Sequence, residues 1–400
     1  MRDAPINRPA STLVIVGDTL HHVDSEGRLC THGALAAQLD LWAAHFDAVQ
    51  FCGVLGQGPP PPGFAPYRSA RISLVPLRQA GGASLRAKVN VVRAAALWLW
   101  QLVPALRAAD GVHLRTPCNV TLLGIPLARL LVKNRYAIFA GSWDPYAGEP
   151  KSYKIQRWML KHLFGGTVHA YRPAAHHPAD TATAGNVRPG FSPVLTAHAL
   201  ACLAASASEA RSVEPPPGEG RPLRVACVGR FSLNKNQTTL ASALRDLHAS
   251  GMQVQCRFIG DGPELARVRA SVELPGVTFT EHASRDEVFA TMTWADVNVL
   301  PSLREGFPKV LLEGMSAGAL PIASDTPVNR SMVQDRGWTF DPNSSSDLAH
   351  VLETATSLSE AEWTERRARS RTYAEQHTIE VFAAEVDHIV NTIWTRAGAR

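Results

Sequence analysis

Cysteine is scarce in this chain, and no two cysteines have the spacing of a metal or redox motif. Six cysteines occur in 400 residues, and none of them stands in a CxxC pair. The missing motif excludes a zinc ribbon and a dithiol redox centre, and the low number excludes a disulfide-stapled scaffold. The sequence therefore favours a reducing, cytoplasmic setting.

Long hydrophobic runs and an N-terminal leader are also missing. The longest apolar stretch covers residues 94–106 and contains Gln101 and Pro104. Its 13 residues are too few for a helix to cross the roughly 30 Å of a bilayer core. No basic segment followed by an apolar one opens the chain. We therefore predict neither a membrane span nor a secretory signal.

The composition is otherwise that of a globular protein. Apolar residues make up 45% of the chain and charged residues 19%. A sequence with this fraction of apolar residues can bury a hydrophobic core, which excludes disorder for most of the chain. At about 150 residues per domain, the length indicates two or three domains.

Positive charge is concentrated in the first half. Residues 1–200 hold 20 Lys and Arg against 10 Asp and Glu, or +10, and residues 201–400 hold 20 against 25, or −5. A basic half indicates an anionic partner, such as a phosphorylated ligand or an anionic membrane surface, unless the arginines are simply solvated. We find no nucleic-acid recognition module, so nucleic acid is not an expected partner.

One apolar segment suits a lipid interface. Residues 97–100 read Leu-Trp-Leu-Trp and are flanked by Arg86, Lys88, Arg93 and Arg107. Such a mixture allows a helix to lie in the interface of an anionic membrane, whereas the alternative is that these Trp and Leu side chains belong to the core. The hypothesis is peripheral association with the inner membrane face.

Strands and helices are predicted to alternate in both halves. The first half has β-branched runs at 12–16 and 49–54 and an intervening helix around Leu35, Leu39 and Trp42. This alternation is typical of parallel sheets, so we expect an α/β chain of two Rossmann-like doubly wound domains facing across a cleft. In the second half the predicted strands are 223–228, 253–259, 277–280, 297–300 and 321–323, with helices at 237–249, 263–272, 285–294 and 309–317 between them.

A Pro- and Gly-rich stretch divides the chain near its middle. Residues 213–222 read VEPPPGEGRP, which is typical of a linker. The predicted organisation is a first domain over residues 1–200, a linker over 201–221, a second domain over 222–378 and a terminal helix over 379–400.

Three segments of the second half lie where predicted strands end. In residues 228–236, VGRFSLNKN, Gly229 permits close backbone approach and is followed by the cations Arg230 and Lys235 before a helix begins. Two cations beside a helix N-terminus suit a diphosphate, although the pair could also be ordinary surface charge. In residues 258–265, FIGDGPEL, Gly260 and Gly262 would let a flat ring lie on the backbone, or simply form a turn.

The third segment carries two glutamates. Glu305 precedes a predicted helix, and Glu313 follows eight residues later among apolar neighbours. A carboxylate in apolar company requires a partner, for example the hydroxyls of a ribose. The backbone amides at Gly306 and Phe307, before Pro308, could donate to an anion or a hydroxyl.

In this order and spacing, the three segments resemble the retaining glycosyltransferases of family 4, which have the GT-B fold, with Glu305 and Glu313 as the E-x7-E signature. The resemblance covers residues 222–335 well. It implies that the first domain binds the acceptor, that the domain over 222–378 binds the nucleotide-sugar and that the terminal helix packs back on the first domain. It also implies that Arg230 and Lys235 hold the donor's diphosphate, that Glu305 contacts the donor sugar and that Glu313 binds the ribose. The chain contains no DxD motif and no cofactor is implied, so we expect no bound metal. The expected donor-binding residues are Gly229, Gly260, Gly262, Gly306, Phe307, Pro308 and Glu313.

The first half departs from that family. Ala140 stands where members often have a sugar-contacting histidine, so Ser142, Asp144 or His113 could take its place. Trp143 and Asp144 could instead frame an acceptor, through a stacking face beside a hydrogen-bond acceptor. The family's glycine-rich N-terminal loop is approximated only by residues 31–33, ending in Gly33.

The expected function is transfer of a sugar, of hexosyl type, from a nucleotide-diphosphate sugar to a hydroxyl of a glycan or lipid-linked acceptor, in polysaccharide or glycolipid biosynthesis. Two alternatives remain. One is a GT-B sugar-nucleotide epimerase, and the other is a partner subunit that binds nucleotide-sugar but has lost its chemistry. A dehydrogenase is disfavoured because no GxGxxG follows the first strand.

Overall fold

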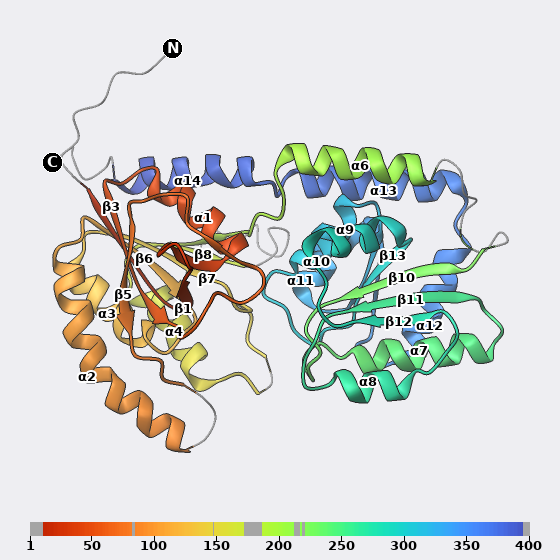
Figure 1. The fold of residues 1–400 in the computed structure, drawn as a ribbon, viewed down its shortest axis with the longest axis horizontal. Helices are drawn as coiled ribbons and strands as arrows, with labels where there is room; N and C mark the ends of the chain where they lie inside the picture. Colours follow the sequence, from red (N-terminus) through yellow and green to blue (C-terminus); the bar gives the residue numbers. More distant parts are fainter. Residues whose placement is uncertain are drawn as a thin grey trace, which may run out of the picture. The chain divides into compact units, whose positions relative to one another are not determined.

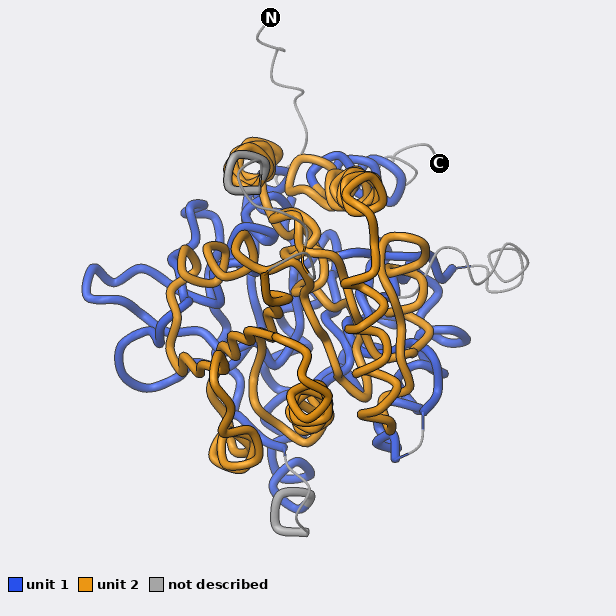
Figure 2. Tube along the Cα trace, turned by 90° about the vertical axis from the view of Figure 1, so that its right-hand side faces the viewer, with its two compact units in different colours: residues 1–172, 177–191, 383–400 blue, residues 173–176, 192–382 orange. Residues whose placement is uncertain are grey.

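The computed structural model describes residues 11–81, 85–146, 148–171, 186–211, 217 and 221–394 (Figure 1). These residues belong to two compact units, which are coloured separately in Figure 2. Unit 1 holds the described residues up to 171, then 186–191 and 383–394. Unit 2 holds residues 192–211, 217 and 221–382.

Unit 1 is built on a nine-stranded sheet whose main body is parallel. The parallel strands run in the order β5-β3-β1-β6-β7-β8-β9, and β1 also pairs antiparallel with β2, which pairs with β4. Their bounds are β1 Thr12–Val23, β2 Leu29–His32, β3 Ala48–Leu55, β4 Phe64–Pro66, β5 Ile72–Leu77, β6 Gly111–Thr116, β7 Asn134–Phe139, β8 Thr167–Ala170 and β9 Val187–Pro189.

Both faces of this sheet are covered, as the continuous apolar strands require. On one face, Val14, Val16 and Leu114 form a core with Trp98 and Leu160 from the helices of that side. On the other face, Trp42 of α1 packs on the β6–β7 pair. The helices of unit 1 are α1 Gly33–Ala43, α2 Leu85–Arg107, α3 Thr121–Leu131, α4 Lys151–His162 and the part of α14 (Ile379–Trp394) from Ala383 onward.

Unit 2 has a six-stranded parallel sheet in the order β12-β11-β10-β13-β14-β15. From β10 the chain builds outward through β11 and β12, then returns to place β13 on the other side of β10. This reversal is a topological switch point, where ligands bind in such sheets. The strands are β10 Leu223–Val228, β11 Val254–Ile259, β12 Val277–Thr280, β13 Val297–Leu300, β14 Leu320–Ser324 and β15 Trp338–Phe340.

The helices of unit 2 cover both faces of its sheet (Figure 1). Their sequences carry clear start signals; for example, Ser284 and Ser359 each form a capping box with the glutamate three residues later. They are α6 Ala197–Arg211, α7 Gln237–Ala249, α8 Leu265–Ser271, α9 Arg285–Trp294, α10 Lys309–Ser316, α11 Pro327–Val333, α12 Ser345–Thr356 and α13 Glu360–Glu375, with the short 3₁₀ helix η2 Gln334–Arg336 after α11.

The predicted linker is wrong over residues 201–211. That stretch is part of helix α6, which belongs to unit 2, so the boundary predicted at residue 200 falls inside a helix. The Ala-rich sequence of α6 favours a helix, whereas the Pro and Gly signals begin only after it. Residues 212–216 and 218–220 of the predicted linker lie outside the described residues.

Helix α2 is longer than the apolar stretch predicted. Its residues Val89–Arg107 are long and apolar enough to cross a membrane by length and composition alone, and 28% of that stretch is buried. One side of α2 packs into the core of unit 1 through Trp98, Leu102 and Leu106, and the Trp98 indole donates to the Arg78 carbonyl over 3.0 Å. The other side exposes Val92 and Trp100, which are 74% and 76% exposed.

Candidate functional site

Two loops meet at the switch point of unit 2. The loop after β10 and the loop after β13 are joined by three hydrogen bonds through Asn234. The Leu303 amide donates to the Asn234 carbonyl over 2.8 Å, the Asn234 side-chain amide donates to the Arg304 carbonyl over 3.0 Å, and the Arg304 guanidinium donates to Asn234 Oδ1 over 3.1 Å. Asn234 was not singled out from the sequence, although it lies beside Lys235 within the motif.

The same loops bring Lys235 and Glu305 into direct contact. Lys235 Nζ lies 2.6 Å from Glu305 Oε1, and the two side chains are 27% and 12% exposed. A charge-assisted hydrogen bond of this length fixes both groups at the edge of the sheet. Arg230 is exposed, and its carbonyl accepts a hydrogen bond from the Gln237 side chain over 3.1 Å. The structure therefore brings together two of the three predicted catalytic groups and leaves the third at the surface.

Three of the four glycines predicted to bind the donor, Gly229, Gly260 and Gly262, have different structural roles. Gly260 and Gly262 have φ of +132° and +144°, and a Cβ there would lie 2.2 Å from the carbonyl oxygens of Gly229 and Phe231 respectively. The loops after β10 and β11 thus pack backbone to backbone, and the Phe231 amide donates to the Asp261 carbonyl over 2.7 Å. Gly229 has φ +153°, but no described heavy atom lies within 4 Å of its ideal Cβ position. Only Gly229 therefore leaves open space beside its backbone.

The segment before α10 offers unused donors. Pro308 is the N-cap residue of α10, and among the described residues the amides of Glu305 and Gly306 have no hydrogen-bond partner. The Phe307 ring is half-buried and packs 5.7 Å from the His377 ring. Phe307 thus supports the loop with its side chain, while the neighbouring amides remain available to a ligand.

Glu313 lies on α10 and is partly buried. Burial raises the pKa of its carboxyl group, and the cations Lys309 and Arg285 act in the opposite direction. Within the part of the chain that the structure describes, its carboxylate forms no hydrogen bond and no ion pair. A half-buried acceptor of this kind suits hydroxyl groups of a bound ligand.

Two of the residues predicted on the acceptor side are wrong. His113 is buried in the middle of β6, with its ring 4.7 Å from that of Trp42 and 4.8 Å from that of Tyr136. Burial lowers the pKa of His113, so the ring stays neutral. Trp143 is 9% exposed and packs against Phe139 within the core, so it offers no stacking face.

The other predicted acceptor-side residues lie nearer the surface. Gly33 begins α1, but its amide donates to the Gly63 carbonyl over 2.9 Å and is therefore occupied. Ser142 donates to the Asp144 carbonyl over 3.1 Å. Both Ser142 and Asp144 follow β7 and are partly exposed, so they remain candidates at the carboxyl edge of the sheet of unit 1.

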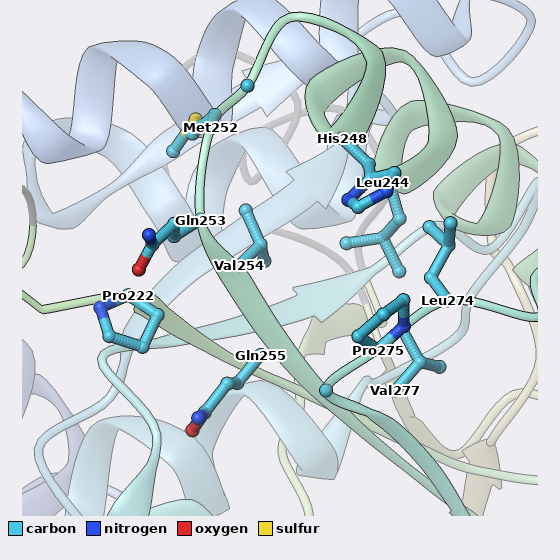
Figure 3. A pocket seen from close by; sticks show the side chains of 12 residues that line it. Pro222, Leu244, His248, Met252, Gln253, Val254, Gln255, Leu274, Pro275 and Val277 are labelled. Carbon is cyan, nitrogen blue, oxygen red and sulfur yellow. The ribbon is translucent and has the colours of Figure 1, made fainter.

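A pocket of about 350 Å³ lies at the opposite edge of the sheet of unit 2 (Figure 3). It lies where β10, β11 and β12 begin, whereas the candidate residues follow the ends of the strands. None of its lining residues is a Lys, Arg, Asp or Glu, so it does not suit a charged ligand. The lining residues are Pro222, Leu244, His248, Gly251, Met252, Gln253, Val254, Gln255, Leu274, Pro275, Gly276 and Val277.

Neither a metal cluster nor a disulfide is found in the described part of the chain. No group of three or more His, Cys, Asp or Glu side chains there is placed to hold a metal ion. All six cysteines are free thiols, and five of them are buried.

Comparison with known proteins identifies the region that holds this site. Residues 212–377 match the family model of glycosyl transferases group 1. Over 213 residues the chain is 27% identical to the 2-deoxystreptamine glucosyltransferase of Streptomyces kanamyceticus, an alignment that covers 52% of this chain and 54% of that one. The match thus spans about half the length of this relative.

Solved structures extend the likeness to nearly the whole chain. Sucrose-phosphate synthase from Thermosynechococcus elongatus aligns with a TM-score of 0.70 at 15% identity, over 96% of this chain and 100% of that one. The chain has the GT-B fold. Another solved structure, Anabaena HepE in complex with UDP and glucose, aligns with a TM-score of 0.67 at 14% identity, over 95% of this chain and 99% of that one. The predicted fold class, two Rossmann-like parallel-sheet domains, is confirmed.

Proposed function

We propose that this chain is a retaining glycosyltransferase of family 4, of hexosyl type and independent of metal. It would move a sugar from a nucleotide-diphosphate sugar to a hydroxyl of a glycan or lipid-linked acceptor, in polysaccharide or glycolipid biosynthesis. The observation that carries this proposal is the Lys235–Glu305 ion pair at the switch point of unit 2, together with Glu313 on the adjoining helix, whose carboxylate has no partner among the described residues. The name of the Streptomyces relative, a glucosyltransferase, supports the same class of reaction.

In the proposed reaction the bond between C1 of the donor sugar and the diphosphate oxygen breaks. The acceptor oxygen then bonds to C1 from the face that the diphosphate leaves, and its proton passes to the departing phosphate oxygen. Lys235, with Arg230, stabilises the negative charge that develops on the leaving group. Glu305 orients Lys235 and the hydroxyls of the donor sugar, while Glu313 accepts from the ribose hydroxyls. Catalysis rests on position and charge and needs no covalent nucleophile.

A thermal-shift panel tests the donor site. We expect one class among UDP-, GDP- and ADP-sugars to raise the unfolding temperature in the presence of EDTA, since a ligand at 100 times its Kd adds about 2.7 kcal/mol of stability. Glu313→Ala should reduce this shift, whereas Glu353→Ala, a change at an exposed glutamate on α12, should leave it intact. No response from any donor would contradict the proposal.

Product analysis separates the two alternatives from the proposed function. A partner subunit without chemistry would bind the donor but yield no glycosylated product with any acceptor. An epimerase would interconvert the free nucleotide-sugar, which chromatography of the donor pool detects without an acceptor. Transfer with retention of the anomeric configuration supports the proposed glycosyltransferase.

We further propose that the chain works in the cytoplasm and associates peripherally with an anionic membrane through α2. The exposed side of α2 carries Val92, Leu97 and Trp100 together with Arg93 and Arg107, all of them exposed. The opposite side of α2 is anchored in the core of unit 1, which favours a helix lying on the membrane over one that spans it.

Vesicle sedimentation tests this surface. At low salt the protein is expected to pellet with vesicles containing phosphatidylserine and to remain in the supernatant with pure phosphatidylcholine. Replacing Val92 and Trp100 by Gln should reduce the bound fraction several-fold, because two large apolar groups leave the contact. Val381→Gln, at an exposed apolar residue of α14, is the control. Equal pelleting by the double variant would exclude α2 as the contact.

A further inference from the structure

Arg115 is a charged residue in a strand of unit 1 that otherwise has buried side chains. It lies near the carboxyl end of β6, beyond Leu114, the last residue that pairs with β1. The side chain is mostly buried but keeps some exposure to solvent. Within the described residues, its guanidinium has no hydrogen bond and no ion pair. A guanidinium carries five donors and is always charged, so burying it without a partner is unfavourable.

The groups around Arg115 do not neutralise it. Those that act on it electrostatically are the hydroxyls of Tyr171, Tyr136 and Tyr67 and the thiol of Cys118. Burial raises the pKa of the Cys118 thiol to about 11 and raises the pKa of Tyr67 and Tyr136 still higher, so these groups are neutral at neutral pH. Burial is also the main cause that lowers the pKa of Arg115 itself.

The nearest carboxyl group along β1 does not pair with Arg115 either. Asp18 has a raised pKa, caused mainly by burial, whereas an adjacent guanidinium would lower it. The hydroxyl of Tyr67 is already engaged. His21 Nδ1 faces the Thr19 carbonyl at 3.1 Å and therefore carries the proton, so His21 Nε2 accepts from the Tyr67 hydroxyl over 2.8 Å.

The backbone of β1 passes close to Arg115 at an irregular point of its pairing. The pairing of β1 with β3 shifts between Val16 and Leu20, which makes a bulge over residues 17–19. Gly17, in that bulge, has no side chain, and a Cβ there would lie 3.2 Å from the Cβ of Arg115. Bulges of this kind occur beside binding sites, where they end the pairing and redirect the strand. Arg115 therefore lies just beyond the end of the β1–β6 pairing while still paired with β7, near the carboxyl ends of the parallel strands, where such sheets bind ligands.

Arg135, in the same unit, is an arginine whose guanidinium has hydrogen-bond acceptors. Its guanidinium donates to the carbonyls of Val132, Phe164 and Gly165 over 2.6, 2.9 and 3.0 Å. Arg135 is therefore a structural residue that ties β7 to neighbouring loops. Arg115 lacks any such set of acceptors among the described residues.

We propose that Arg115 binds an oxyanion, the phosphate or carboxylate group of an acidic sugar acceptor. This proposal rests on the proposed glycosyltransferase function, because a sugar bound at Arg115 is an acceptor only if the chain transfers a sugar to it. A guanidinium matches two oxygens of either group in a bidentate arrangement, which favours an acidic sugar over a neutral one. The unsatisfied donors of Arg115 would then be satisfied only in the complex.

Calorimetric titration of the full chain tests this site with glucose 6-phosphate, glucuronate, inorganic phosphate and neutral glucose as probes. We expect one of the two acidic sugars to bind and neutral glucose not to bind. The acidic sugar that binds shows whether the site takes a phosphate or a carboxylate. Arg115→Gln should weaken that binding by about 10- to 100-fold, as expected for a lost charged hydrogen-bond pair. Arg188→Gln, at an exposed arginine on β9, should leave it unchanged. The Lys235→Ala variant should also retain it, since that cation belongs to the donor site.

The unfolding temperature separates a binding role from a structural one. Arg115→Gln should leave it unchanged or raise it, because an unpaired buried cation is removed, whereas Arg135→Gln should lower it. Equal sugar binding by wild type and Arg115→Gln, or a loss of stability in Arg115→Gln as large as in Arg135→Gln, would overturn the proposal. Binding of nucleotide-sugar is measured on the same samples. If the nucleotide-sugar binds but neither acidic sugar does, only the role proposed for Arg115 is wrong. If an acidic sugar binds but no nucleotide-sugar does, the proposed donor site is wrong.

Discussion

Glu305→Ala is expected to reduce glycosyl transfer by about 10²–10³-fold while leaving the protein folded. The carboxylate holds Lys235 Nζ at 2.6 Å, so its loss frees the cation that, in the proposed reaction, stabilises the leaving diphosphate. The site is partly exposed, and a freed lysine there can be hydrated, so stability should change little. Steady-state transfer rates and the unfolding temperature, measured on the same preparation, check both parts.

Two further variants show whether the pair acts as a unit. Lys235→Ala should lower transfer to a similar extent, and the double variant should lose little more than either single one, because both changes remove the same interaction. Glu365→Ala, which removes an exposed ion pair with Arg369 on α13, is the matched control and should retain full activity. Normal transfer by Glu305→Ala would show that this carboxylate has no part in the reaction.

Gly262→Ala should destabilise unit 2 by roughly 3 kcal/mol, from the strained φ and from the close contact together. The new Cβ would lie 2.2 Å from the Phe231 carbonyl oxygen, at a φ of +144°. To make room, the loops after β10 and β11 have to separate, which weakens the 2.7 Å hydrogen bond from Phe231 to Asp261. For a unit of this size the unfolding temperature should fall by about 5–10 °C, which calorimetry measures.

Gly251→Ala is the control for backbone strain alone. Gly251 has φ +84°, but no described heavy atom lies within 4 Å of its ideal Cβ. We expect it to cost about 1 kcal/mol, the usual penalty for a side chain at positive φ. Equal effects of the two substitutions would mean that contact with Phe231 contributes nothing.

Much of unit 2 could be predicted from the sequence. Its β-branched runs are bounded by glycines and alternate with amphipathic helices, and the strands predicted at 223–228, 277–280 and 297–300 are observed with those bounds. Because each of the three motif segments follows the end of a predicted parallel strand, it could also be predicted that they lie at the same edge of the sheet. The contact between Lys235 and Glu305 was not, because it depends on β13 returning to lie beside β10, and strand order is not encoded locally.

Unit 1 illustrates the limits of local patterns. His113 alternates with buried Val112 and Leu114, and in a sheet open on one side it would face solvent. Helix α1 covers that face, so the histidine is buried against Trp42. Likewise, the significance of Arg115 depends on what its neighbours lack, which no pattern in the sequence reveals. The linker prediction was wrong because it extended the Pro- and Gly-rich signal after residue 211 back over the Ala-rich residues before it, which form a helix.

The Lys235–Glu305 pair also has a consequence for anion selectivity. Without donor, the ammonium group already has a counter-ion, so an incoming anion must compete with a carboxylate at 2.6 Å. A small anion that replaces that contact one for one gains little from the exchange. A diphosphate can accept from Lys235 and also from the amides of Glu305 and Gly306, which have no hydrogen-bond partner in the described part of the chain. If this site binds the proposed donor, the Glu305 carboxylate is a built-in competitor for Lys235, and abundant small anions are then poor competitors of a nucleotide-sugar.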